Sequence, residues 1–134
     1  MKIINVTAAV LEKGGRILIA RRKKGDHQEG KWELPGGTIE ENELPEECLK
    51  RELLEEFGIE TQVREFIMEN VHEYRDKTIR LMAYRVRHVS GDFILREHEQ
   101  IAWLTAGEME SYSFAEADIP ILQRLAPANG VKKS

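Results

Sequence analysis

The 134 residues are enough for one domain that buries about two thirds of the surface its unfolded chain exposes, so folding requires no metal or disulfide. Apolar residues make up 41% and charged residues 33%, as in soluble globular proteins, and the formal charge of −4 argues against nucleic-acid polymers as partners. The single cysteine, Cys48, excludes an internal disulfide and fits a reducing cytoplasm. No stretch approaches the roughly 18 apolar residues of a membrane span, so no membrane partner is expected.

Two apolar runs open the chain, at residues 3–11 and 16–20, with Gly14 and Gly15 between them. This pattern predicts a β-hairpin. Both runs are apolar on two faces, which favours strands covered by helices on both sides of a sheet. The basic residues 21–24 follow at once, either as a solvated strand end or as a cationic rim for phosphates.

A helix is expected at about residues 44–57, after the glycines at 36 and 37. Pro45 suits its first turn, and Gly58 can take the left-handed conformation that stops it. Apolar residues recur at fourfold spacing on one face: Leu49, Leu53 and Phe57. That face should pack on the sheet.

The remaining pattern predicts strands at residues 59–72, 78–89 and 101–104, then a helix at 116–126. Pro120 lies in the first turn of this last helix, and Ile119, Leu122 and Leu125 are spaced for one buried face. A single domain over residues 1–127 with a flexible tail at 128–134 is therefore expected.

Negative charge is concentrated in residues 37–59, which hold eight glutamates against one lysine and one arginine. Three of these glutamates, Glu52, Glu55 and Glu56, are spaced three and four apart and share one face of the predicted helix. Like charges placed this way repel each other. A hard, oxygen-preferring cation such as Mg²⁺ would explain the arrangement, because it takes carboxylates together with substrate phosphates.

The order Gly37, five residues, Glu43, seven residues, Arg51-Glu52-Leu53, one residue, Glu55-Glu56, one residue, Gly58-Ile59 resembles the complete Nudix box. The similarity extends over about residues 2–126. It includes the ARR after the second strand and the segments GKWELPGG, REHEQIAW and ADIPIL, which look like the small MutT-type members of this family. Those members hydrolyse nucleoside triphosphates, and they include CTP and 8-oxo-dGTP pyrophosphohydrolases.

The resemblance implies an α/β fold, an α/β/α sandwich with a mixed sheet between helices. It also implies Mg²⁺-dependent hydrolysis, with Mn²⁺ as a possible substitute, giving a nucleoside monophosphate and pyrophosphate. By the same resemblance, Glu52, Glu55 and Glu56 bind the metal with help from the backbone carbonyl of Gly37. Arg51 would orient these carboxylates, while Glu43 and Gly58 would support the motif structurally.

Outside the box, the resemblance implies that Glu97, six residues before Trp103, is a further metal ligand or general base. Glu99 competes for this role, because a one-residue shift of the loop would exchange the two. Arg22 would contact the phosphates, and Arg21, which alternates with it along the strand, would point elsewhere.

Base recognition would involve Trp32 and Leu34, although Trp32 could equally be a core residue. Asp118 matches the Asn or Asp that reads the base edge in MutT relatives, and a carboxylate there accepts from cytosine N4 or guanine-type N–H groups. Asp118 could instead be a helix cap. Thr38 departs from the pattern, because several members place there a lysine that assists the leaving group.

The substrate expected is a (d)CTP-like or oxidised nucleotide such as 8-oxo-dGTP. The alternatives are hydrolysis of ADP-ribose or dinucleoside polyphosphates and a non-catalytic nucleotide-binding module. Against ADP-ribose, the chain has no proline between Pro45 and Pro120, and Tyr74 gives weak support for dinucleoside polyphosphates. We expect a cytoplasmic monomer or homodimer.

Overall fold

The structure, a computed structural model, describes residues 2–23, 25 and 29–125. Its strands and helices follow in chain order: β1 (Ile3–Lys13), β2 (Arg16–Arg22), β3 (Trp32–Glu33), α1 (Pro45–Phe57), β4 (Glu60–Glu73), β5 (Thr78–Ser90), β6 (His98–Leu104), the 3₁₀ turns η1 (Ala106–Ser111) and η2 (Glu116–Asp118), and α2 (Ile119–Leu125). No helix in the described ranges is long and apolar enough to cross a membrane.

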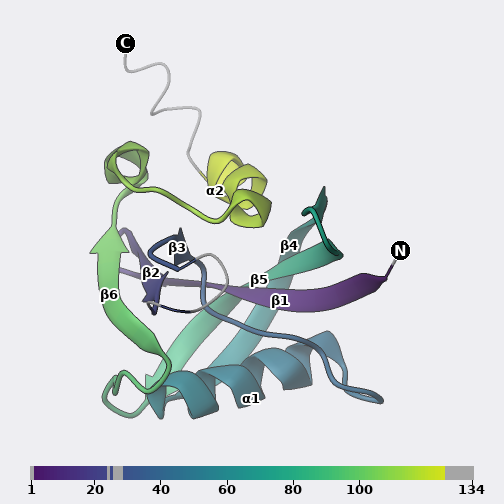
Figure 1. The fold of residues 1–134 in the computed structure, drawn as a ribbon. Helices are drawn as coiled ribbons and strands as arrows, with labels where there is room; N and C mark the ends of the chain where they lie inside the picture. The colour runs from purple at the N-terminus through teal and green to yellow at the C-terminus, as the bar shows by residue number, and fades with distance from the viewer. Residues whose placement is uncertain (1, 24, 26–28, 126–134) are drawn as a thin grey trace.

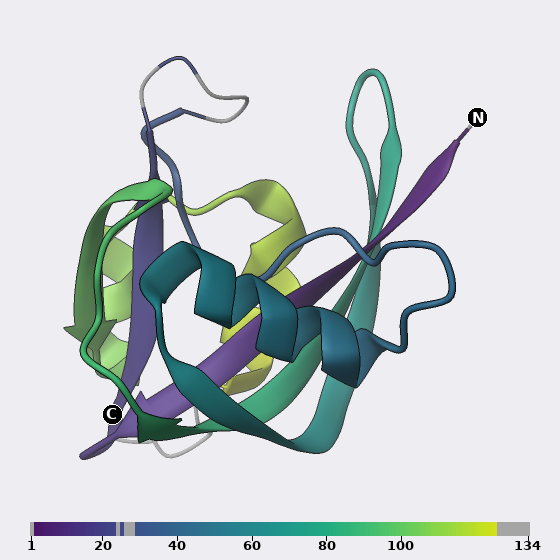
Figure 2. The ribbon, with the colours of Figure 1, turned by 90° about the horizontal axis from the view of Figure 1, so that it is seen from below.

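The sheet is mixed and runs in the order β3-β2-β1-β5-β4, with β6 also paired to β2. β1 is parallel to β5, from the pair Ile3 and Thr78 to the pair Leu11 and Val86, while the other strand pairs are antiparallel. Helix α1 covers one face and α2 the other (Figures 1 and 2). The predicted α/β/α sandwich is confirmed.

The β1–β2 hairpin forms where the glycine pair predicted it. Gly14 and Gly15 have φ angles of 58° and 78°, which is the left-handed backbone that a two-residue hairpin turn requires. Glu12 therefore pairs with Ile17, and Lys13 pairs with Arg16. This hairpin places the end of β2 beside β3 and β6, where the site described below is built.

Helix α1 has the predicted limits. Pro45 is its first residue, and Gly58 ends it with a φ of 72° and an N–H that donates to the Leu54 carbonyl. Leu49, Leu53 and Phe57 are fully buried and pack on the sheet. Burying side chains of this size stabilises the fold by roughly 1.5 to 3 kcal/mol each, so the apolar face fixes which way the helix faces.

Three predictions at the C-terminal end differ from the structure or fall outside it. β6 begins at His98, because pairing with β2 outweighs the polar character of residues 98–100. The last helix opens as the 3₁₀ turn η2. Leu122 is buried as predicted, but Ile119 is 38% exposed and Ile121 is fully buried in its place. The predicted tail, 128–134, lies outside the described residues.

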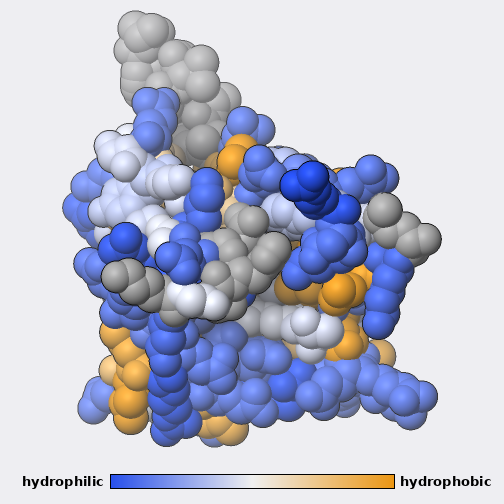
Figure 3. Space-filling model, viewed as in Figure 1, coloured by the Kyte–Doolittle hydropathy of each residue, from blue (hydrophilic) through white to orange (hydrophobic). Residues whose placement is uncertain are grey.

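The surface seen in Figure 3 is mostly hydrophilic, and its hydrophobic side chains form separate small groups. The sheet divides the hydrophobic core into two clusters, one under α1 and the other under α2 and the 3₁₀ turns. The loop between β3 and α1 runs beside β1 in the middle of the sheet; it begins with the buried residues Leu34 and Pro35 and becomes exposed at residues 40–42.

Candidate active site

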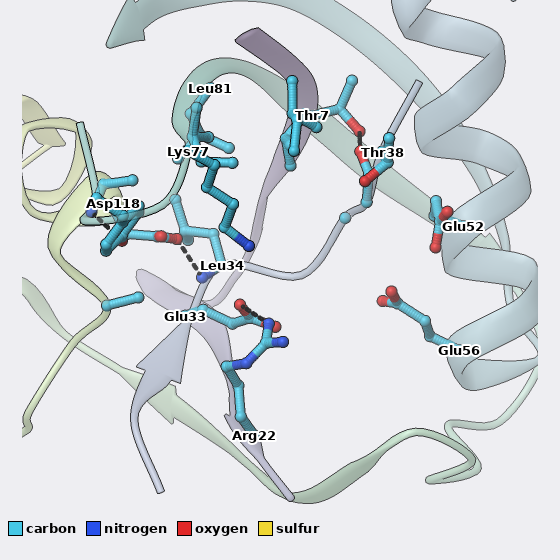
Figure 4. Close-up of a pocket in the computed structure, with 18 of the residues that line it drawn as sticks. Thr7, Arg22, Glu33, Leu34, Thr38, Glu52, Glu56, Lys77, Leu81 and Asp118 are labelled. Atoms are coloured by element: carbon cyan, nitrogen blue, oxygen red, sulfur yellow. Dashed lines mark hydrogen bonds and ion pairs between the residues drawn. The ribbon is translucent and has the colours of Figure 1, made fainter. Parts of the chain in front are cut away.

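A cavity of about 380 Å³ opens between α1, the loop before it and the ends of β2 and β3 (Figure 4). Glu52 and Glu56 line it from α1, and Arg22 and Glu33 face them from the strands. Its lining is completed by apolar side chains of β1 and β5: Ile4, Val6, Ile79 and Leu81. The cavity thus joins charged walls to an apolar surface on which a flat ring could lie.

The loop that carries the glycines is fixed to β1. Ala9 donates its backbone N–H to the Pro35 carbonyl at 2.7 Å, and the Thr7 N–H donates to the Gly37 carbonyl at 2.8 Å. The Thr7 hydroxyl donates to the same Gly37 carbonyl at 3.2 Å. The carbonyl expected to bind metal is therefore already engaged. The neighbouring Gly36 carbonyl, which accepts none of the hydrogen bonds found in the described ranges, also belongs to the lining.

Glu52 and Glu56 form a carboxylate pair on one wall of the cavity. Glu56 is 4% exposed, and its Oε1 has no hydrogen-bond partner among the described residues. Burial, the charge of Glu52 and that of Glu33 raise the pKa of Glu56 well above its usual range, and burial also raises the pKa of Glu52. Buried carboxylates cost free energy unless a positive group neutralises them. A divalent cation fits this donor set.

Gly37 makes room for this pair. A Cβ added to Gly37 would lie 2.2 Å from the Glu52 carboxyl carbon and 2.5 Å from each of its oxygens. The carboxylate therefore rests directly on the glycine backbone. The described residues contain no preassembled group of three or more metal-binding side chains.

Arg51 connects the box residues. Its guanidinium donates to Glu43 at 2.7 and 3.0 Å, to Glu52 at 3.1 Å and to Glu55 at 3.2 Å. It also reaches the Thr38 carbonyl at 3.3 Å. The hydrogen bond from Arg51, followed by one from the Glu40 backbone, lowers the pKa of Glu43 to about 2. Arg51 thus ties the loop to the helix and contacts Glu52 and Glu55, two of the three helix glutamates predicted to bind metal.

Asp118 lies at the opposite end of the cavity from α1 (Figure 4). Its Oδ2 accepts the backbone N–H of Leu34 at 2.9 Å, a buried tertiary contact between residues 84 positions apart. Burial, together with the charge of Glu33, raises the pKa of Asp118 well above its usual range.

Most of the predicted site residues meet in the cavity. Its lining includes Arg22, Leu34, Gly37, Glu52, Glu56, Glu97 and Asp118. Glu99 instead pairs with Arg21 at 3.5 Å, so both residues are directed away from the cavity as the strand alternation indicated for Arg21.

Five predicted site residues are not in the lining: Glu43, Arg51 and Gly58, which belong to the supporting part of the box, and Glu55 and Trp32. Glu55 is 53% exposed and held by Arg51, so it faces solvent beside the cavity. Trp32 is 8% exposed and packs edge-on against Tyr112 at 5.1 Å between ring centroids. It occupies the core cluster under α2, which matches the core alternative, because strand alternation turns Trp32 to the opposite face from Glu33.

Sequence reasoning missed Glu33, Lys77 and His98. Glu33 could have been found from strand alternation, since it lies between two residues that were considered. Lys77, in the turn between β4 and β5, also lines the cavity and has no local signal, because only the parallel pairing of β1 with β5 brings that turn to the site. His98, which contacts Glu33 at 2.9 Å, lies in a polar stretch before the strand predicted at residues 101–104, where the sequence gives no sign of burial.

Together, the fold and site define an α/β/α sandwich in which a glycine loop and an acidic helix share one cavity with a basic strand end. The chain belongs to the NUDIX domain family, which matches residues 1–125. It is 39% identical over 123 residues to a protein of Escherichia coli K12 named CTP pyrophosphohydrolase, covering 92% of this chain and 91% of that one. It is 32% identical over 125 residues to the Haemophilus influenzae 8-oxo-dGTP diphosphatase, covering 92% of each chain.

Solved structures agree with these sequence relationships. The solution structure of the E. coli ORF135 protein superposes with a TM-score of 0.85 at 36% identity, covering 100% of this chain and 96% of that one. A MutT protein from Methanosarcina mazei has a TM-score of 0.84 at 24% identity, covering 92% of each chain, which shows the shared fold. The chain is accordingly a hydrolase of the Nudix type.

Proposed function

We propose that this Nudix hydrolase cleaves (d)CTP-like or oxidised nucleoside triphosphates such as 8-oxo-dGTP to the monophosphate and pyrophosphate, in cytoplasmic nucleotide-pool sanitation. The observation that carries the proposal is a pair of glutamates, the buried Glu56 and the half-buried Glu52, facing Arg22 and Lys77 across one cavity. Carboxylates on one wall suit a divalent cation, and cations on the other suit phosphate oxygens.

Glu52 and Glu56 would hold Mg²⁺, or Mn²⁺ in its place, together with Glu97 from the loop before β6. The engaged state of the Gly37 carbonyl supports Gly36 as the backbone ligand. Glu55 would become a further metal ligand once its hydrogen bond from Arg51 is broken. When bound, the cation supplies neutralisation of the phosphate charge and a more acidic water for attack at phosphorus.

The protein's own groups would do the remaining work. Arg22 would bind phosphate oxygens from the end of β2. Lys77 would supply positive charge that this chain lacks after Gly37, where Thr38 stands in place of a lysine. The Glu97 carboxylate would accept the proton of the attacking water, since general bases act within hydrogen-bond reach of the group they deprotonate.

The base would lie at the end lined by Leu34 and Asp118. The buried carboxyl of Asp118 can accept a hydrogen bond from an exocyclic amine or ring N–H, as cytosine and guanine-type bases present. The apolar side chains of β1 and β5 provide the adjoining surface. Trp32 is left out of this contact because it packs in the core.

The other substrate classes have less support. Tyr74, whose position raised dinucleoside polyphosphates, accepts the Ala117 N–H on its hydroxyl at 2.9 Å, which gives it a structural role. Glu56 is a buried glutamate with one carboxylate oxygen that has no partner among the residues the structure describes, and a non-catalytic binding module would have no need of such a group.

The test is a substrate panel of CTP, dCTP, 5-methyl-dCTP, 8-oxo-dGTP, ADP-ribose and dinucleoside polyphosphates, with and without Mg²⁺, in which the nucleotide products are separated by chromatography and turnover is scored by kcat/KM. We expect Mg²⁺-dependent turnover of one or more triphosphates and its loss in Glu56→Gln, with the fold intact by circular dichroism. Preference for ADP-ribose or dinucleotides would refute the substrate class. Binding of these nucleotides without any turnover would refute the proposed catalytic activity.

A further inference from the structure

His98 is a buried polar residue beside the cavity. It is 7% exposed and begins β6, directly opposite Arg22 in the β2–β6 pairing. Glu33 is opposite Ala20, two residues earlier on β2. Because opposed residues of antiparallel strands share a face, the side chains of Arg22, Glu33 and His98 lie together on the side of the sheet that faces α1.

Glu33 is held at both oxygens. Its Oε1 accepts Arg22 Nη1 at 2.8 Å, and its Oε2 accepts His98 Nε2 at 2.9 Å. The side chain of Glu33 is 16% exposed and that of His98 6%, so water competes weakly for these bonds. Charge-assisted hydrogen bonds in such surroundings fix the orientation of both partners.

The imidazole has a second fixed contact. It stacks on Phe57, the last residue of α1, with ring centroids 5.5 Å apart and planes 9° apart. His98 Nδ1, however, is buried and has no partner in the described part of the chain. A phenyl ring could fill this space without burying an unpaired nitrogen, which costs free energy. Packing alone therefore does not explain a histidine here, whereas the Nε2–H bond to Glu33 does.

We propose that His98 is a positioning residue that holds Glu33, and through it Arg22, in the orientation that receives the nucleotide. This inference rests on the proposed function for its effect on turnover. Stacking on Phe57 sets the plane of the imidazole, the Nε2–H fixes one oxygen of Glu33, and the other oxygen then directs the Arg22 guanidinium. The relay links the end of the carboxylate-bearing helix to the strand wall of the cavity.

Two substitutions separate the hydrogen bond from the packing. His98→Phe keeps a ring on Phe57 but removes the N–H, and His98→Gln loses the ring but can donate an N–H to Glu33. We expect His98→Phe to raise KM for the best nucleotide by about tenfold, the scale of a lost hydrogen bond to a charged group, with a smaller change in kcat. His98→Gln should retain most of kcat/KM. In a Glu33→Ala background, His98→Phe should cause no further loss.

The opposite ranking, with His98→Phe equal to the unmodified protein and His98→Gln impaired, would overturn the inference in favour of packing. Equal loss in both variants, with a lowered Tm, would also overturn it. A second readout does not depend on turnover: the ¹⁵N-edited NMR signal of Arg22 Nε should shift in His98→Phe and stay near its original position in His98→Gln. An inactive unmodified protein would refute the proposed function, while this NMR comparison would still decide the role of His98.

Discussion

Replacing Gly37 by alanine gives a direct test of how the loop seats the metal-binding helix. The new Cβ would lie 2.2 Å from the Glu52 carboxyl carbon, whereas carbon atoms in contact are separated by about 3.5 Å or more. The carboxylate must therefore retreat by about 1 Å. A displacement of this size in a catalytic group can cost about 100-fold in rate.

The backbone of Gly37 is outside the left-handed region, and the clash is with the end of a flexible side chain. The fold should therefore survive the substitution. We expect kcat of Gly37→Ala to fall by about 100-fold, and the Mg²⁺ concentration for half-maximal pyrophosphate release to rise. Its thermal unfolding should remain near that of the unmodified protein.

Gly107→Ala is the matched control, because a Cβ at Gly107 meets nothing within 4 Å and should leave activity unchanged. Gly36→Ala would place a Cβ 2.0 Å from the Thr7 carbonyl oxygen, a backbone atom, and should impair folding itself. If Gly37→Ala showed unmodified kcat and Mg²⁺ dependence, the seating of Glu52 on the loop would have no part in catalysis.

The pKa of Glu43, lowered to about 2 in the folded protein from an ordinary 4.5, contributes stability that is present above pH 4.5 and lost as pH falls toward 2. Glu43→Gln should therefore be less stable at pH 7 and lose less stability over that window, as urea midpoints at several pH values would show; parallel curves would contradict this. Lys77→Ala should raise KM for triphosphates by about tenfold, while Arg75→Ala in the same turn, outside the cavity lining, should not; equal effects would remove Lys77 from phosphate binding. Asp118→Asn can still accept the Leu34 N–H and should keep the fold while changing the ranking of bases at similar Mg²⁺ dependence, whereas an unchanged ranking would leave Asp118 a structural role.

The sequence pattern predicted a structural feature correctly wherever that feature depends on residues close together in the chain. The glycine pair at 14 and 15 specifies a hairpin because few other residues accept its backbone angles. Pro45 and Gly58 set the ends of α1 for the same kind of reason. Helical periodicity distinguishes the buried apolar face of α1 from its acidic face. The negative charge of the acidic face indicates a bound cation from the sequence alone.

The shape of the site required tertiary structure. Periodicity alone makes Glu55 and Glu56 equivalent members of the acidic face. Glu55 is nevertheless exposed beside Arg51, whereas Glu56 is buried with one oxygen unpaired within the described ranges. The difference arises from the loop and strands that pack over the C-terminal part of α1. Likewise, nothing in residues 98–100 indicates that His98 would be buried against Glu33, 65 positions earlier.

The sequence by itself determined the β1–β2 hairpin and the limits of α1, because turn chemistry, helix caps and hydrophobic periodicity act between near neighbours in the chain. The sandwich and the reaction class followed from the resemblance of residues 37–59 to the Nudix box. Only the tertiary structure decided which acids of α1 enter the cavity, that Trp32 is core, and that Lys77, Glu33 and His98 belong to the site. Those assignments depend on strand order and register, which bring together residues far apart in the chain, and no spacing along one element encodes them.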